Sequence, residues 1–86
     1  MITARPMTVS AIQITAVDGE KLATVEKMLG FLDIAGRRGS GLVVLPEVWT
    51  GLGYSSEDAY LEIAEPIPGP TTDLLAAKAR QYGMHI

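Results

Sequence analysis

A short apolar run, Leu42-Val43-Val44-Leu45, constrains this chain more than any other feature, because no polar residue interrupts it and Pro46 follows directly. A run of this length, with two adjacent β-branched residues, favours a strand that is buried on both faces. Proline cannot donate a hydrogen bond to a neighbouring strand, so we expect this strand to end before Pro46.

An earlier segment, residues 8–14, is predicted to be a second buried strand. It is rich in β-branched residues, and apolar side chains occupy both of its alternating faces. One face carries Val9, Ala11 and Gln13, and the other carries Ser10, Ile12 and Ile14.

The segment between these strands has the periodicity of an amphipathic helix over residues 20–38. Its apolar residues recur at steps of three and four and therefore form one stripe. The stripe consists of Leu22, Val25, Met28, Leu29, Leu32 and Ala35. Asp18 is a candidate N-cap and Gly39 a candidate left-handed stop, while Lys21 and Asp33 are expected to face solvent. A strand, a helix and a strand in about 35 residues predict a βαβ unit with parallel strands.

The second half of the chain begins with a stretch rich in glycine and proline over residues 48–70. A short helix is predicted within it at 56–63, with Ser55 and Asp58 spaced as a capping pair. A second clear helix is expected at 73–82.

The ends of that second helix carry their own signals. Thr71 or Thr72 is expected to cap it, and Gly83 is expected to stop it. Residues 84–86 then resemble the opening of a third strand. The overall prediction is an α/β fold: a βαβ unit followed by a loop, a helix and the start of a third strand.

Composition narrows the classes of function. The chain has 86 residues, a net charge of −3 and no cysteine. The charge disfavours nucleic acid as a partner, and the missing cysteines exclude disulfides, cysteine-containing zinc sites and a thiol nucleophile within these residues. No run is long enough to span a bilayer and no secretory signal is recognisable, so the expected location is cytoplasmic. Residues 1–7 are expected to be flexible.

One carboxylate stands at a position of chemical interest. Glu47 follows Pro46, at the carboxyl end of a predicted parallel strand, where ligands bind in open α/β folds. Apolar surroundings there would raise the carboxyl pKa and make it a usable general base. From spacing alone, a solvated surface carboxylate is the favoured interpretation.

The ordered set of features resembles the opening of the nitrilase superfamily of carbon–nitrogen hydrolases. The set comprises the strand ending in Gln13, the amphipathic helix, Gly39, the run Leu42–Leu45, Pro46-Glu47, Pro68-Gly69-Pro70-Thr71-Thr72 and the helix closing in Tyr82-Gly83. The likeness covers residues 8 to 86. It implies that residues 1–86 form the N-terminal part of a four-layer α-β-β-α sandwich that pairs into homo-oligomers.

The resemblance also implies a mechanism. In that family a Glu, a Lys and a Cys act in chain order on a small amide, carbamoyl or nitrile substrate, without a cofactor. Glu47 matches the general base, whereas Lys21, Lys27 and Lys78 do not match the family's lysine, and Lys78 is expected to be a solvated helix residue. The nucleophilic Cys is absent, so this chain alone is expected to be inactive.

Other positions depart from the family pattern or stay open. Thr24 replaces a frequent Asn, Gly41 replaces a frequent Asp, and Gly53-Tyr54 appears one residue late. Tyr54 is a candidate substrate-binding residue, with packing as an equal alternative, and packing is favoured for Trp49. His85, the single histidine, makes no metal site without partners.

Two other classes of function remain open at this point. A non-catalytic α/β interaction module, or a remnant that folds on association, fits the missing cysteine. An accidental resemblance in a small α/β domain is the third possibility. The substrate and the subfamily are not readable from these residues.

Overall fold

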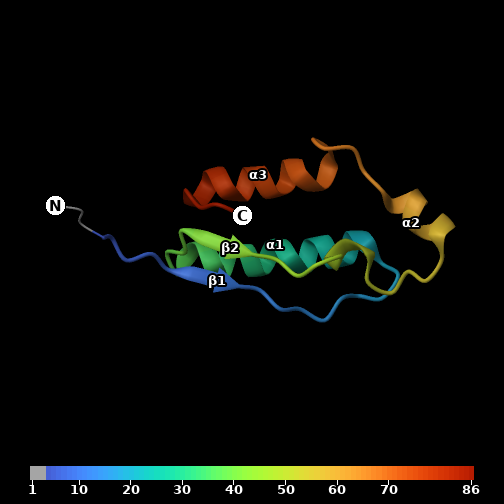
Figure 1. Cartoon of the computed structure of the whole chain (residues 1–86), viewed down its shortest axis with the longest axis horizontal. Helices are drawn as coiled ribbons and strands as arrows, with labels where there is room; N and C mark the ends of the chain where they lie inside the picture. Colours follow the sequence, from blue (N-terminus) through green and yellow to red (C-terminus); the bar gives the residue numbers. More distant parts are fainter. Residues whose placement is uncertain (1–3) are drawn as a thin grey trace.

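The structure, a computed structural model, describes residues 4–86 (Figure 1). Its elements, in chain order, are β1 (Val9–Ala11), α1 (Lys21–Arg37), β2 (Leu42–Val44), the short 3-10 helix η1 (Trp49–Gly51), α2 (Glu57–Ile63) and α3 (Pro70–Tyr82). Residues 1–3 of the segment predicted to be flexible lie outside the described residues. Residues 4–7 are exposed and belong to no helix or strand.

The predicted βαβ unit is confirmed. Strands β1 and β2 are parallel and adjacent, with Ser10 opposite Val43, and α1 connects them. The predicted third strand is present only as an isolated parallel bridge between Leu42 and His85. The chain is therefore an α/β structure, as expected.

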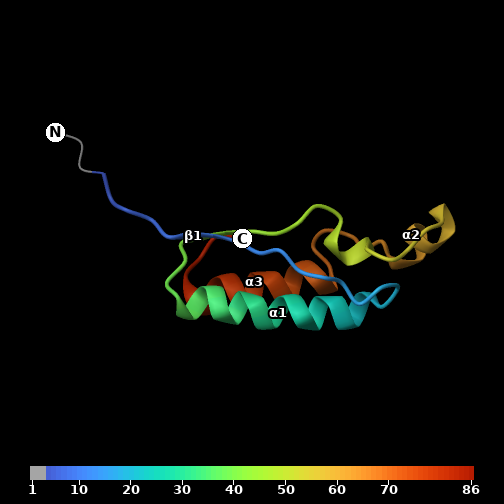
Figure 2. The same cartoon turned by 90° about the horizontal axis from the view of Figure 1, so that it is seen from below.

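Both long helices cover the same face of the strands. Figure 2 shows α1 and α3 side by side on one side of β1 and β2. Val43, at 1% exposure, and Met84 are buried from the strand side against this helical layer. The buried apolar residues that form the core are Val25, Met28, Leu32, Ala35, Val43, Trp49 and Met84.

The opposite face of the strands carries exposed apolar side chains. Val9 is 56% exposed and Val44 is 51% exposed. Leu42 lies beside them, and its side chain is also exposed. The prediction that both strands are buried on both faces was therefore wrong for these residues. The physical reason is that the two long helices of the chain pack on the same side, so nothing among residues 4–86 covers the other side.

A partly buried polar contact joins α1 to α3. Asp33 Oδ1 accepts hydrogen bonds from Lys78 Nζ at 2.7 Å and from the Tyr82 hydroxyl at 2.8 Å. These bonds, that of Lys78 first, lower the pKa of the Asp33 carboxyl, and the same contact raises the pKa of Tyr82. The expectations that Asp33 faces solvent and that Lys78 is a solvated lysine were wrong, because each meets its partner on the facing helix.

The start of α1 differs from the prediction. Asp18 does not cap the helix; α1 begins at Lys21 without a side-chain cap from the preceding residue. Instead, Thr24 is buried; its hydroxyl accepts a hydrogen bond from the N–H of Val17, at 3.1 Å, and donates one to the Val17 carbonyl, at 3.3 Å. Thr24 therefore ties the helix to the segment that enters it.

At the ends of α2 and α3, some of the predicted caps and bounds are confirmed and others were wrong. The cap of α2 is Ser56, not Ser55, and its hydroxyl accepts from the N–H of Ala59 at 3.1 Å. Helix α3 begins at Pro70 rather than at residue 73, because proline suits the first helical position. Gly83 ends it in the left-handed conformation, as predicted.

Candidate active site

Glu47 lies where the sequence places it, directly after Pro46 at the carboxyl end of β2. The residue is exposed. Neither salt bridge found among residues 4–86 involves its carboxylate. Glu47 does not line the cavity of about 290 Å³ that the loop after it shares with Lys21 and Tyr60. The described residues therefore present the carboxylate to solvent and do not enclose it.

The residue after Glu47 has an unusual backbone. Val48 adopts the left-handed conformation, with φ 55° and ψ 25°. A β-branched residue rarely occupies this region, and such a conformation persists only when its surroundings impose it. The chain turns sharply here, so Val48 sets the direction in which the segment leaves Glu47.

Trp49 anchors the turn that follows. It opens η1, is 9% exposed and belongs to the hydrophobic core. The favoured interpretation of Trp49 as a packing residue is therefore confirmed. Because Trp49 lies two residues after Glu47, the core fixes one side of the loop that carries the carboxylate.

The far side of the same loop is fixed to the chain before α1. The N–H of Gly19 donates to the carbonyl of Leu52 at 3.3 Å. Gly53 has φ +85°, and a methyl group added there would lie 2.3 Å from the nitrogen of Gly19 and 2.5 Å from the Cα of Asp18. Only glycine fits this approach between two backbones.

Tyr54 is half-buried and its hydroxyl accepts the N–H of Lys21, the first residue of α1, at 3.0 Å. It also lines a cavity together with Glu62 and Ile63. No hydrogen bond within residues 4–86 brings Tyr54 and Glu47 together. The hydroxyl thus satisfies a free helix amide, and a role in substrate binding remains a prediction.

The sequence matches the carbon–nitrogen hydrolase family over residues 8–86. The chain belongs to the carbon–nitrogen hydrolase family. Comparison with curated proteins and with solved structures returns no match. The matched range is the same as the range of the resemblance to the nitrilase superfamily, and that prediction is confirmed.

Sequence reasoning also missed a polar cluster at the start of α1 in this carbon–nitrogen hydrolase chain. Lys21 Nζ pairs with the Glu65 carboxylate and donates to the Ile63 carbonyl. Glu65 also accepts the backbone N–H of Thr71 at 2.6 Å and the Thr71 hydroxyl. The bond from Lys21 first, and then those from Thr71, lower the pKa of Glu65 to about 2.

A signal for this cluster was present in the sequence. A lysine in the first turn of a helix opposes the helix dipole, so its presence at the start of α1 calls for an anionic partner. Lys21 was instead assigned to solvent, whereas its side chain is 13% exposed. The partner, Glu65, lies too far along the chain for periodicity to reveal the contact.

Within residues 4–86, no group of three or more His, Cys, Asp or Glu side chains is arranged to hold a metal ion. No helix of this part of the chain has the length and apolar character needed to cross a membrane.

Proposed function

We propose that Glu47 is the general base of a hydrolase that cleaves non-peptide C–N bonds in a small amide, carbamoyl or nitrile substrate. The observation that carries the proposal is the position of Glu47 at the carboxyl end of β2, inside a carbon–nitrogen hydrolase match that spans residues 8–86. The carboxyl ends of parallel strands are where α/β folds bind ligands.

The chemistry follows that of an activated nucleophile. A carboxylate takes the proton of a cysteine thiol, and the thiolate attacks the substrate carbon. A lysine stabilises the negative charge of the tetrahedral species, and water then hydrolyses the acyl-enzyme. These 86 residues contain no cysteine. The thiol and the catalytic lysine are therefore proposed to come from residues other than 1–86.

The exposed carboxylate of Glu47 and the uncovered face of the strands support the proposal that other residues complete the active site. Glu47 faces solvent, and the apolar side chains of Val9 and Val44 are half or more exposed on the uncovered face of the strands. A second sheet packed on that face would cover these side chains and enclose the end of β2. Residues 1–86 are accordingly proposed to be one part of an α-β-β-α sandwich, in a cytoplasmic protein.

The reaction class is tested on the complete reading frame that contains these residues. Its purified product is incubated with amides, carbamoyl compounds and nitriles, and ammonia release is followed with and without iodoacetamide treatment. Ammonia release that alkylation abolishes is expected. Release that resists alkylation would rule out a thiol nucleophile, and no release from any substrate class would count against the proposed reaction.

A non-catalytic role is the second candidate. The exposed apolar face of β1 and β2 favours association with another polypeptide, because open apolar patches of this kind mark contact surfaces. A homo-oligomer and an association with other parts of the same protein are both compatible with that surface. The preceding experiment distinguishes the two candidates, because a hydrolase releases ammonia and a non-catalytic module does not.

A further inference from the structure

Lys21 is the point at which three later segments of the chain meet. Its backbone N–H donates to the Tyr54 hydroxyl at 3.0 Å. Its ammonium group donates to the carbonyl of Ile63, the last residue of α2, and pairs with Glu65 in the linker that follows. The start of α1 therefore holds the loop after Glu47 and the end of α2 at the same place.

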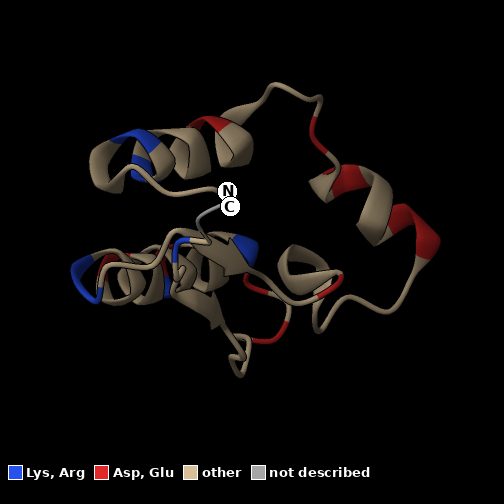
Figure 3. Ribbon diagram, turned by 60° about the vertical axis from the view of Figure 1, so that its left-hand side comes forward, with Lys and Arg blue, Asp and Glu red and all other residues tan. Residues whose placement is uncertain are grey.

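The surroundings make a lysine favourable at this position. The helix dipole disfavours a cation at the start of α1, but α2 and its linker are acidic. Figure 3 shows acidic residues along α2, where Glu57 and Asp58 form the first turn. Glu65 supplies the negative charge that pairs with the Lys21 ammonium group. Its carboxylate also accepts a hydrogen bond from the N–H of Thr71, in the first turn of α3.

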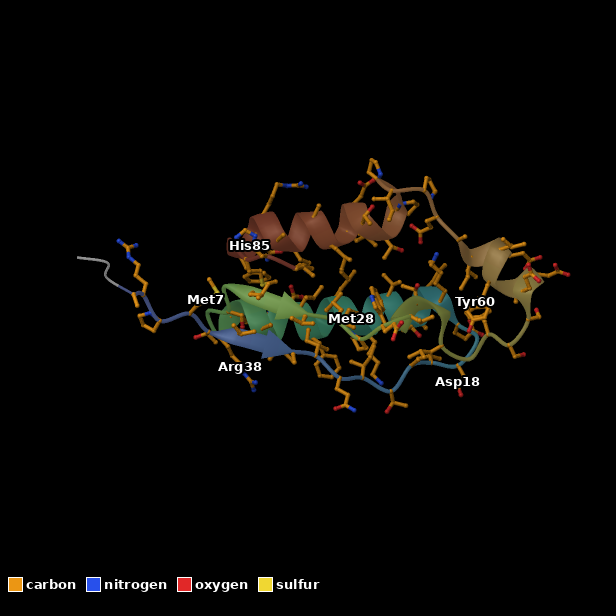
Figure 4. All side chains as sticks on the ribbon, viewed as in Figure 1. Met7, Asp18, Met28, Arg38, Tyr60 and His85 are labelled. Atoms are coloured by element: carbon orange, nitrogen blue, oxygen red, sulfur yellow. The ribbon has the colours of Figure 1, made fainter. Side chains whose placement is uncertain are left out.

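Helix α2 in turn contacts the loop that carries Glu47. The Tyr60 ring lies against Gly51, since a methyl group added to Gly51 would lie 2.8 Å from Tyr60 Cε1 and 3.2 Å from Val48 Cγ1. Figure 4 shows Tyr60 on the side of α2 that faces this loop. A cavity of about 290 Å³ lies among these groups, and Lys21, Val48 and Tyr60 are all in its wall.

We propose that Lys21 is a positioning residue for Glu47. It holds the end of α2 through its ammonium group and Tyr54 through its amide, and these two attachments keep the loop that begins at Glu47 against α1. The strained backbone of Val48 needs such attachments, because a left-handed β-branched residue persists only where its surroundings fix it. The consequence for catalysis rests on the proposed function, whereas the attachment itself does not.

The chain contains its own probe for this proposal. Trp49 is the single tryptophan, lies two residues after Glu47 and is 9% exposed. Its fluorescence quenching by acrylamide reports how well the loop is held against the core. The matched control is Lys27, a second lysine of α1, whose ammonium donates to the Thr15 carbonyl at 2.6 Å at an exposed site.

The experiment compares the 86-residue chain with K21M, K21R and K27M at one protein concentration, with far-UV circular dichroism to confirm retained helix. K21M is expected to raise the acrylamide quenching constant of Trp49 at least about twofold, because a released loop exposes the indole. K21R restores the cation and is expected to return the constant to the wild-type value, and K27M is expected to leave it unchanged.

Two results would overturn the proposal: wild-type quenching in a folded K21M, or an equal increase in K21M and K27M. If K21M does not fold, K21Q carries the same test, since glutamine is shorter than lysine and removes the charge that pairs with Glu65 and donates to the Ile63 carbonyl. An unchanged quenching constant in folded K21Q would likewise overturn it. Because no step measures ammonia, a failure here leaves the proposed role of Glu47 standing, and a failure of that role leaves this attachment standing.

Discussion

The aromatic ring of Tyr82 lies directly on Gly36: a methyl group added to Gly36 would lie 2.2 Å from Tyr82 Cγ. This contact allows α1 and α3 to approach closely, and it places the Tyr82 hydroxyl 2.8 Å from Asp33. The absence of a side chain at one residue of α1 thus determines how the helical layer packs.

Gly36→Ala is expected to destabilise the fold by about 1–3 kcal/mol, because the added methyl group must displace an aromatic ring that is already packed. The measurement is the urea midpoint followed by circular dichroism. The control is Gly30→Ala on the same helix, where no atom lies within 4 Å of the added group. That variant is expected to gain up to about 1 kcal/mol from helix propensity. Equal effects of the two variants would refute the close contact.

Gly53→Ala tests the attachment of the loop after Glu47. Gly39 has a similar left-handed backbone, with φ +80° against +85°, but open space around it. Gly39→Ala is therefore expected to cost only the strain of the conformation, about 1–2 kcal/mol. Gly53→Ala is expected to cost more, because its methyl group would also collide with the backbone of residues 18 and 19. Equal losses in a urea melt would argue against the collision.

The stability of the fold is expected to fall in acid through Glu65. Its pKa is lowered from 4.5 to about 2, so its contribution is fully present above pH 4.5 and is lost as the pH falls from 4.5 towards 2. Glu65→Gln is expected to remove about 1–3 kcal/mol near pH 7, where the charged bonds exist, and progressively less below about pH 4. Urea melts of both proteins across this range provide the check; a constant difference at every pH contradicts the assignment.

How far the sequence predicted this structure depends on the range of the interactions. The periodicities that defined β1, α1 and β2 are local, and the structure confirms their bounds to within three residues at every end. The left-handed stop at Gly83 was also readable, because it depends on glycine alone. The burial of Leu42 and Val44 was predicted wrongly, since burial depends on which elements cover the strands.

The polar contacts were the least predictable part. Asp33 and Lys78 are 45 residues apart in sequence, and each alone resembles a solvated charge on a helix. The same holds for Lys21 and Glu65, which meet only after α2 has brought the chain back to the start of α1. Glu47 was singled out only because the resemblance to the nitrilase superfamily implies a catalytic residue there, and no local pattern distinguishes it from a surface carboxylate.

The chain alone is expected to associate through the open face of its strands. Val44→Ser is expected to weaken association about tenfold or more, since a buried valine contributes at least about 1.5 kcal/mol. Leu22→Ser is the control and is expected to have no effect: the predicted apolar stripe of α1 included Leu22, but that prediction was wrong, because the side chain is 82% exposed. Sedimentation across a dilution series measures both. A monomer with a steep urea transition at every concentration would show that these residues are self-sufficient.

The isolated 86-residue chain is expected to release no ammonia from amides, carbamoyl compounds or nitriles. It has no thiol, and loss of a nucleophile removes several orders of magnitude in rate. Turnover above background that Glu47→Gln abolishes would mean that these residues catalyse the reaction by another route.

The role of Glu47 as general base is tested most directly by the kcat/KM of Glu47→Gln in the product of the complete reading frame. Glutamine preserves the shape of the side chain but cannot take a proton, so kcat/KM is expected to fall about 100-fold to 10,000-fold. Glu57→Gln, an exposed glutamate at the start of α2, serves as the control and is expected to keep wild-type activity. Wild-type kcat/KM in a folded Glu47→Gln variant would contradict the account.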